Sequence, residues 1–228
     1  MKVHVVSLFP EFFTTPLETS LVGKAINDGH LEVVLHDPRD HATGVHRQVD
    51  DAPYGGGAGM VMMVEPLAET LDPLEHTHRV FFTPAGTPLT QEMLDRFAEM
   101  DEITLVCGRY EGVDERFVEH FIDEEVSLGD FVLLGGEVAA LAAIEGVSRL
   151  IPGTVGTPRS TEHESFRNGE LEEPQYTRPA EVRGWEVPAV LGSGDHGECA
   201  VWRAQQRQER TRVRRPDLLE DAEPVEEG

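Results

Sequence analysis

The chain has 228 residues, of which 39% are hydrophobic and 27% are charged. This composition supplies enough apolar material for one large or two small folded domains and argues against a disordered chain. No apolar run approaches the roughly 20 residues that a membrane-spanning helix needs. Acids follow the N-terminus too soon for a signal peptide. The two cysteines, Cys107 and Cys199, lie too far apart for a metal-binding motif. We therefore expect a reduced, cytoplasmic protein without a membrane partner.

Charge is spread unevenly along the chain, which has 43 acids, 19 bases and a net charge of −24. A chain of this kind repels polyanions on average. However, segment 203–215 holds six arginines and one acid, whereas the stretch from Asp217 onward holds six acids and no base. The sequence thus predicts a local basic face on an acidic protein. One explanation for the overall acidity is a salty cytoplasm, where surface carboxylates help to keep a protein soluble.

Strands and helices alternate along the first two-thirds of the chain. β-Branched runs predict strands, and apolar residues at helical spacing predict helices. In chain order these are strand Val3–Leu8, helix 16–28, strand Leu31–Leu35, helix 64–71, strand Val80–Thr83, helix 90–100, strand Ile103–Cys107, helix Asp114–Phe121 and helix Glu137–Leu150. This alternation predicts an α/β fold with a parallel sheet covered on both faces. Such sheets bind ligands at the carboxyl ends of their strands.

The pattern changes at Ile151–Pro179, which is rich in Gly, Pro, Thr and Glu and shows no period. Loops of this length are usually functional or disordered. We therefore predict a first domain over 1–155, a linker over 156–179 and a small, mainly helical domain with an acidic tail over 180–228. This last domain is too small to bury a core alone, so we expect it to pack on the first domain or on another subunit.

Four glycine-containing segments are candidates for a ligand site: Thr83–Gly86, Val106–Arg116, Ser127–Glu137 and Tyr54–Gly59. Two of them, Thr83–Gly86 and Val106–Arg116, follow predicted strands, and exposed backbone amides in such segments suit a nucleotide or a carboxylate. Each segment also has a plainer explanation. Thr83–Gly86 would be a simple turn, and Val106–Arg116 a strand–helix connection capped by Asp114. Ser127–Glu137 would be a buried strand with a tight turn, and Tyr54–Gly59 a mobile loop. Neither a Walker loop nor a dinucleotide fingerprint is present, which argues against a nucleotide-binding oxidoreductase.

Taken in order, the segments resemble a known family. They are FPEFF at Phe9–Phe13, the glycine loop, CGRYEGVDER, SLGDFVLLGGE, VSRLIPG at Val147–Gly153, PQYTRP at Pro174–Pro179 and RRPDLLE at Arg214–Glu220. This ordered set resembles the bacterial tRNA (guanine-N1-)-methyltransferases of the SPOUT class, the TrmD family, and it covers nearly the whole chain.

The resemblance implies more than the residues alone predict. An ordinary doubly wound sheet would be expected from periodicity, because knots are essentially absent among folds. The family's sheet instead has a deep trefoil knot whose loops hold S-adenosylmethionine, and the family is an obligate homodimer with shared active sites. Its reaction moves a methyl group to N1 of guanine 37 in tRNA. A carboxylate must remove the N1 proton, and a guanidinium stabilises the charge that develops on O6.

Carried over to this sequence, the resemblance implies that the guanidinium belongs to Arg149, which from the residues alone would be a charge at a helix C-terminus. It also implies that the cofactor is held by sixteen residues: Phe81, Phe82, Thr83, Pro84, Gly108, Arg109, Tyr110, Glu111, Gly112, Ser127, Leu128, Gly129, Phe131, Leu133, Gly135 and Gly136.

The position of the general base departs from the family pattern. Where the family has an Asp-Ser-Phe-like stretch, this chain has Glu164, Ser165 and Phe166. We predict that Glu164 is the base, with Glu162 and Asp195 as weaker candidates. One alternative is a tRNA-binding SPOUT protein whose catalysis is weak or lost because of this glutamate. Another is a SPOUT enzyme that acts on ribose or on ribosomal RNA. The chain also reads Gly-Asp-His at Gly194–His196, where the family usually has Gly-Asn-His.

The arginine-rich segment predicts contacts with tRNA phosphates, because arginine forms bidentate phosphate contacts. We expect Arg207, Arg210, Arg214 and Arg215 to make these contacts. Trp202 is expected to anchor the helix rather than to stack on a base. The family's activity is linked to magnesium, but no cluster of metal ligands can be recognised, so no metal site is assigned.

Overall fold

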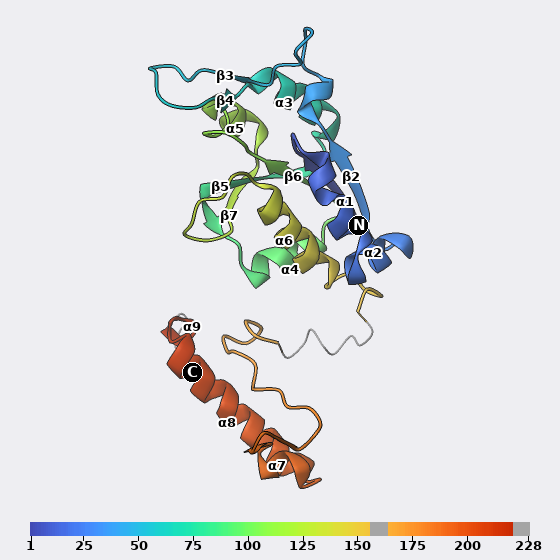
Figure 1. The fold of residues 1–228 in the computed structure, drawn as a ribbon, viewed down its shortest axis with the longest axis vertical. Helices are drawn as coiled ribbons and strands as arrows, with labels where there is room; N and C mark the ends of the chain where they lie inside the picture. The colour runs from blue at the N-terminus through green and yellow to red at the C-terminus, as the bar shows by residue number, and fades with distance from the viewer. Residues whose placement is uncertain (156–163, 221–228) are drawn as a thin grey trace, which may run out of the picture. The chain divides into compact units, whose positions relative to one another are not determined.

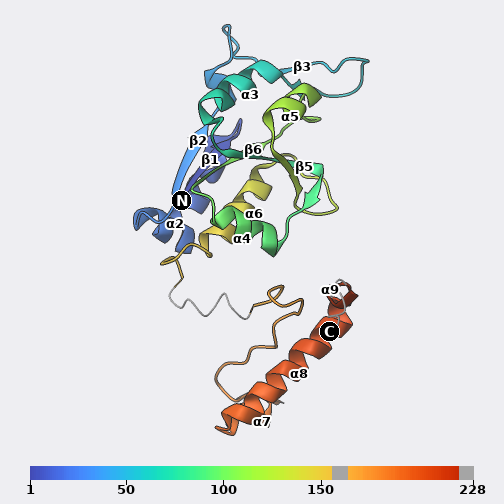
Figure 2. The ribbon, with the colours of Figure 1, turned by 180° about the vertical axis from the view of Figure 1, so that it is seen from behind.

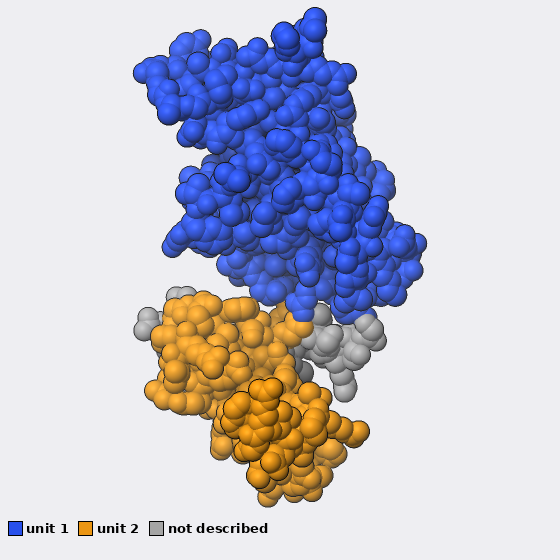
Figure 3. Space-filling model, in the orientation of Figure 1, with its two compact units in different colours: residues 1–156 blue, residues 157–228 orange. Residues whose placement is uncertain are grey.

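The computed structural model describes residues 1–155 and 164–220. The chain divides into two compact units, Met1–Gly156 and Thr157–Gly228, which are coloured separately in Figure 3. Among the described residues, no helix combines the length and the apolar character needed to cross a membrane.

The first unit is built on a five-stranded parallel sheet, as the alternating pattern predicts. Its strands are β1 (Lys2–Val6), β2 (Glu32–His36), β5 (His78–Pro88), β6 (Glu102–Cys107) and β7 (Glu124–Ser127), arranged in the order β2-β1-β6-β5-β7. Strand β7 was not predicted from the sequence, since only four residues form it. A separate two-stranded ribbon joins β3 (Asp50–Asp51) to β4 (Val61–Met62) and frames the glycine loop.

Helices cover both faces of the sheet (Figures 1 and 2). One face carries α2 (Ser20–Asn27), α4 (Gln91–Ala98) and α6 (Glu137–Ser148), and the other carries α3 (Val64–Leu71) and α5 (Glu115–Phe121). The single helix predicted over 16–28 is wrong. Thr19 has extended backbone angles, φ −104° and ψ 145°, which separate α1 (Thr14–Glu18) from α2. Short 3-10 turns occupy Pro10–Phe13, Pro38–Asp40 and Asp72–Leu74.

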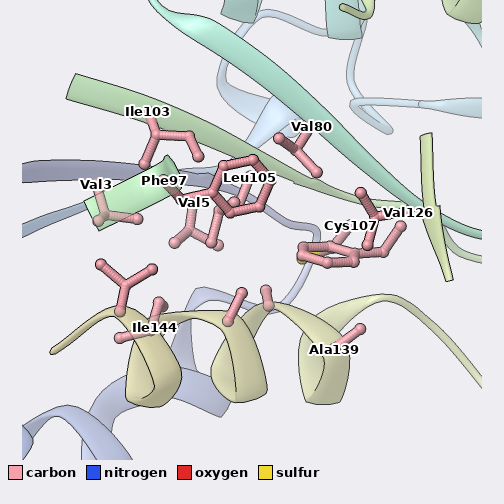
Figure 4. Packing of buried hydrophobic residues seen from close by; sticks show 14 of the residues in the cluster. Val3, Val5, Val80, Phe97, Ile103, Leu105, Cys107, Val126, Ala139 and Ile144 are labelled. Carbon is pink, nitrogen blue, oxygen red and sulfur yellow. The ribbon is translucent and has the colours of Figure 1, made fainter. Parts of the chain in front are cut away.

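Two apolar clusters fill the space between the sheet and its helices. The larger one joins Val3, Val5 and Leu105 of the sheet to Phe97 of α4 and Ile144 of α6 (Figure 4). The smaller one lies on the opposite face, beneath α3 and α5. Strand residues alternate between the two faces, so that Val5 belongs to the larger cluster and its neighbour Val6 to the smaller one. The clusters fix the sheet and thereby fix the loops at its edge.

Strand β5 is longer than expected because the TPAG segment continues the strand rather than turning. Val126 of β7 pairs first with Phe82 and, after a register shift, with Thr87. At Gly86 the two backbones approach so closely that a Cβ would collide with Glu125 and Val126. Glycine is therefore required where β5 passes β7.

The second unit contains β8 (Glu181–Val182), β9 (Trp185–Glu186), α7 (Ala189–Gly192), α8 (His196–Arg214) and α9 (Asp217–Glu220). Helix α8 includes most of the predicted arginine-rich segment and begins at an Asp195 cap, whose carboxylate accepts bonds from Gly197 N (2.8 Å) and Glu198 N (3.0 Å). Asp and Asn cap helices about equally well, so the departure at Gly194–His196 keeps this function. Only Cys199 and Thr211 are buried among the described residues of this unit.

Candidate functional site

A cavity lies where strands β6 and β7 end beside the middle of β5. Its walls come from the middle of β5, from the loop after β6 and from the loop between β7 and α6, elements that Figure 1 labels. Phe82 of β5 pairs with Cys107, the last residue of β6, which brings the first two walls together. This is the place where open α/β sheets bind ligands.

The cavity brings together fifteen of the sixteen residues predicted to hold the cofactor. They are Phe81, Phe82, Thr83, Pro84, Gly108, Arg109, Tyr110, Glu111, Gly112, Ser127, Leu128, Phe131, Leu133, Gly135 and Gly136. Gly129 does not line it and packs instead beside the Phe131 ring. The prediction omitted four lining residues, Val126, Val132, Leu134 and Ala139. Val132 and Leu134 belong to the segment Ser127–Glu137, which would have located them, whereas Val126 and Ala139 lie just outside it.

A buried ion pair supports one wall of the cavity. Arg109 Nε donates to Glu137 Oε1 at 3.0 Å, and Arg109 Nη2 lies 3.0 Å from Glu137 Oε2. Ser7 Oγ donates to the same Oε1 at 2.8 Å. Glu137 is 1% exposed. Because a buried carboxylate is costly unless it is paired, this arrangement fixes Arg109 and the start of α6. Sequence analysis assigned Glu137 no role, and a glutamate in the first turn of a helix gives no signal of burial.

Aromatic and cationic groups stack beside this pair. The Arg109 guanidinium lies 4.5 Å from the centre of the Phe9 ring, and Arg39 lies 5.5 Å from it. Tyr110 adopts a left-handed φ of 60° in the loop after β6. Burial raises the pKa of the Tyr110 hydroxyl, and the nearby Asp50 carboxylate raises it further. A neutral phenol at the cavity rim can therefore serve as a hydrogen-bond donor.

Close backbone packing explains the second glycine of the Gly135–Gly136 pair. A Cβ at Gly136 would lie 2.8 Å from Cys107 Cα. The Gly136 amide donates to Gly108 O at 3.0 Å, which ties the loop after β6 to the start of α6. Burial raises the pKa of the Cys107 thiol well above its usual value, so this cysteine is not a nucleophile.

Arg149 does not line the cavity of its own chain. It caps the C-terminus of α6, whereas Ala139, near the start of the same helix, does line the cavity. At 1.5 Å per residue, the two positions lie about 15 Å apart along the helix axis. Arg149 is thus separated from the fifteen predicted residues that line the cavity.

The predicted general base belongs to the second unit. Glu164 is partly buried, and its carbonyl accepts a bond from Arg167 N at 3.3 Å. Asp195 caps α8, which gives it a structural role, and Glu162 lies outside the described residues.

The four predicted phosphate-binding arginines have different surroundings. Arg214 is exposed and Arg210 is partly buried. Arg207 donates to Glu173 Oε2 at 2.9 Å, and Arg215 lies 2.6 Å from Asp217. Sequence analysis did not foresee these internal carboxylate partners.

Trp202 packs against Tyr176, with ring centroids 6.3 Å apart. This contact agrees with the expected anchoring function of the tryptophan.

The glycine loop at Tyr54–Gly59 does not line the cavity, and Tyr54 is 98% exposed. Its last residue, Gly59, packs against the side chain of Glu111, which lines the cavity, so closely that a Cβ at Gly59 would collide with Glu111. No group of three or more His, Cys, Asp or Glu residues is placed to hold a metal ion in the part of the chain that the structure describes.

Comparison with known proteins identifies the family. The model of the family described as tRNA (Guanine-1)-methyltransferase TrmD matches residues 1–221. The chain belongs to this family. A tRNA (guanine-N(1)-)-methyltransferase of Thermosynechococcus vestitus is 53% identical over 222 residues, which cover 96% of this chain and 94% of the relative. A protein of the same name from Gloeobacter violaceus is 52% identical over 223 residues, covering 96% of this chain and 98% of the relative.

Proposed function

We propose that the protein transfers a methyl group from S-adenosylmethionine to N1 of guanine 37 in tRNA, in the cytoplasm. The observation that carries the proposal is the cavity, in which residues from three separate segments of a TrmD family member meet. Glu164 is the general base, and Arg149 stabilises the charge on O6.

The residues of the cavity fit the cofactor. Leu128, Phe131 and Leu133 offer apolar walls to an adenine ring, and the glycine-rich backbone around Gly135 allows close approach to amide groups. Glu111 supplies an exposed carboxylate at the rim for the ammonium group of the methionine end. When bound, S-adenosylmethionine supplies an activated methyl group on a sulfonium.

The chemistry requires two groups from this chain. N1 of neutral guanine carries a proton, and Glu164 would accept that proton as the new N–C bond forms. Arg149 would donate hydrogen bonds to O6 as negative charge develops there. Glutamate has one methylene more than the family's aspartate, so its carboxylate must fold back to reach N1.

We further propose a homodimer with shared active sites and a trefoil-knotted sheet. The position of Arg149, about 15 Å along α6 from the cavity wall, supports a function in the partner's site. The loop that lines the cavity also exposes Val132 and Leu134, at 82% and 88%, and such an apolar surface suits an interface. The knot is proposed because the chain is a member of the TrmD family.

The arginine-rich face of α8 is the proposed contact with the anticodon stem. Exposed Arg214 is directly available to phosphates, and Arg210, Arg207 and Arg215 lie on the same helix or at its end. Arg215 would exchange its carboxylate partner for phosphate oxygens, whereas Arg207 would contact phosphate while it stays paired with Glu173. We propose no magnesium site, because the described residues contain no group of three or more His, Cys, Asp or Glu side chains that could hold a metal ion.

The proposal is tested by incubating the purified protein with labelled S-adenosylmethionine and an unmodified tRNA that has guanine at position 37. The assay is run at low and high potassium concentrations, and primer extension locates the product. We expect a stop at position 37. Glu164→Ala should lower the rate about 10²–10⁴-fold, the usual contribution of a general base, and Glu164→Asp should remain active.

Glu186→Ala is the matched control, since Glu186 is an exposed acid of the same unit. Cofactor binding without methyl transfer at any salt concentration would favour the tRNA-binding alternative. A wild-type rate in Glu164→Ala would overturn the assignment of the base and direct attention to Glu162.

A further inference from the structure

The segment that carries Glu164 folds into a loop closed by its own backbone. Phe166 N donates to Glu170 O at 2.9 Å, and Glu172 N donates to Ser165 Oγ at 3.0 Å. Phe166 has a left-handed φ of 75°, which turns the chain two residues after the proposed base. We call residues 164–173 the base loop. Because its two ends are bonded to each other, a contact at one end constrains Glu164 at the other.

A single buried hydroxyl docks the base loop on α8. Thr211 is 0% exposed, and its Oγ accepts a bond from Leu171 N at 2.8 Å. The same hydroxyl donates to Arg207 O at 2.8 Å, so both of its hydrogen-bonding functions are used. Loss of this acceptor would leave the partly buried Leu171 amide without this hydrogen bond, which costs free energy.

Ion pairs also hold the base loop on α8, on the side of the helix that carries Thr211. Arg207 Nη1 lies 2.9 Å from Glu173 Oε2, and Arg207 Nε lies 3.5 Å from Glu170 Oε2. Burial, the largest single influence, raises the pKa of Glu173, but the hydrogen bond from Arg207, a backbone hydrogen bond and the charges of Arg207 and Arg203 together outweigh it, so the net pKa is below its ordinary value. The Arg215 guanidinium lies 5.5 Å from the centre of the Phe166 ring. The contacts extend along the loop from Phe166 to Glu173.

We propose that Thr211 and Arg207 are positioning residues that hold the base loop, and with it Glu164, in its catalytic geometry. The inference rests on the proposed function, because it takes Glu164 as the base. Helix α8 then has two tasks: Arg210 and Arg214 bind tRNA, while its loop-facing residues orient the carboxylate. A misplacement of about 1 Å can cost about a hundredfold in rate, so the docking contacts directly affect catalysis.

Thr211→Val tests the proposal, because valine keeps the shape of threonine and removes the hydroxyl. The measurement is single-turnover methyl transfer at saturating tRNA and S-adenosylmethionine, together with the tRNA dissociation constant. We expect the rate to fall about 10–100-fold, in keeping with a misplacement of this order, while tRNA affinity stays near the wild-type value. Thr211→Ser, which keeps the hydroxyl, should restore most of the rate.

Arg207→Gln provides a second variant in case Thr211→Val fails to fold. Its matched control is Arg212→Gln, because Arg212 pairs only with Glu209 on its own helix among the contacts that the structure describes. We expect Arg207→Gln to lower the single-turnover rate and Arg212→Gln to leave it unchanged. If Arg207 only contacts phosphate, its loss would weaken tRNA binding and leave the rate at saturation intact, which would overturn its positioning role.

A double-variant comparison separates this inference from the proposed function. If the base loop acts through Glu164, adding Thr211→Val to Glu164→Gln should cost little further rate. Glu164→Gln with a wild-type rate would overturn the base assignment and, with it, the inference. A large loss in Glu164→Gln together with wild-type rates in both Thr211→Val and Arg207→Gln would overturn the positioning proposal alone.

Discussion

Different forces stabilise the fold of each of the two units. The first unit buries two apolar clusters on opposite faces of its sheet, so its loops are fixed by hydrophobic packing. Among its described residues the second unit buries only Cys199 and Thr211, and ion pairs and hydrogen bonds on α8 organise its extended segment. The difference indicates that hydrophobic packing shapes the cavity, whereas the base loop depends on a few polar contacts. Loss of one such contact should affect catalysis more than it affects folding.

The largest effect is expected from Phe97→Ala, which opens a cavity in the larger cluster. Phe97 is 0% exposed, and truncation of a buried phenylalanine costs about 4 kcal/mol in the free energy of unfolding. Urea titration followed by circular dichroism measures the change. Val201→Ala on the exposed side of α8 is the control and should stay within about 0.5 kcal/mol. Similar losses in the two variants would contradict the contrast between the units.

A somewhat smaller effect is expected from Glu137→Ala, which leaves Arg109 without its carboxylate. Removal of one member of a buried ion pair costs about 3 kcal/mol or more, and the displaced Arg109 should also weaken cofactor binding. Urea titration and calorimetry with S-adenosylmethionine measure the two effects. Glu145→Ala, at an exposed position of the same helix, is the control. Unchanged cofactor affinity in Glu137→Ala would mean that the pair does not shape the cavity.

Asp195→Ala removes the cap of α8 and should destabilise the second unit by about 1 kcal/mol. Asp195→Asn should preserve stability, because the amide oxygen also accepts bonds from the first-turn amides. Both tryptophans, Trp185 and Trp202, belong to the second unit, so thermal unfolding followed by tryptophan fluorescence reports on this unit. Equal stability of Asp195→Ala and the wild type would exclude the cap as a determinant.

The smallest effect is a pH dependence from Glu173. Its pKa lies below the ordinary value of 4.5 in the folded chain. The carboxylate therefore stabilises the fold above pH 4.5, and this contribution is lost as the pH falls through the lowered pKa. Partly exposed ion pairs contribute less than about 1 kcal/mol. Glu173→Gln should lose this contribution at pH 7 and converge with the wild type at acid pH, as judged by tryptophan fluorescence. Glu186→Gln is the control, and an unchanged difference at every pH would contradict the prediction.

The outcomes show where local patterns succeed and where they fail. Periodicity predicted four of the five parallel strands and the helices on both faces, because each depends on its own residues. The helix over 16–28 was wrong because the extended backbone at Thr19 interrupts a continuous apolar stripe. TPAG was interpreted as a turn because proline and glycine usually end strands, yet pairing with β7 extends β5 to Pro88. The family resemblance supplied the lining residues of the cavity, which chemistry alone left open.

The sequence by itself predicted four of the five parallel strands, most of the helices between them and the arginine-rich helix, because spacing and backbone conformation are local properties. Only the tertiary structure decided which polar groups meet. Ser7 and Glu137 are 130 residues apart in the chain, and Leu171 and Thr211 are 40 apart. Neither pair has a local signal, since a buried glutamate and an exposed one look alike in a sequence. Their contacts arise from packing, and packing places the site.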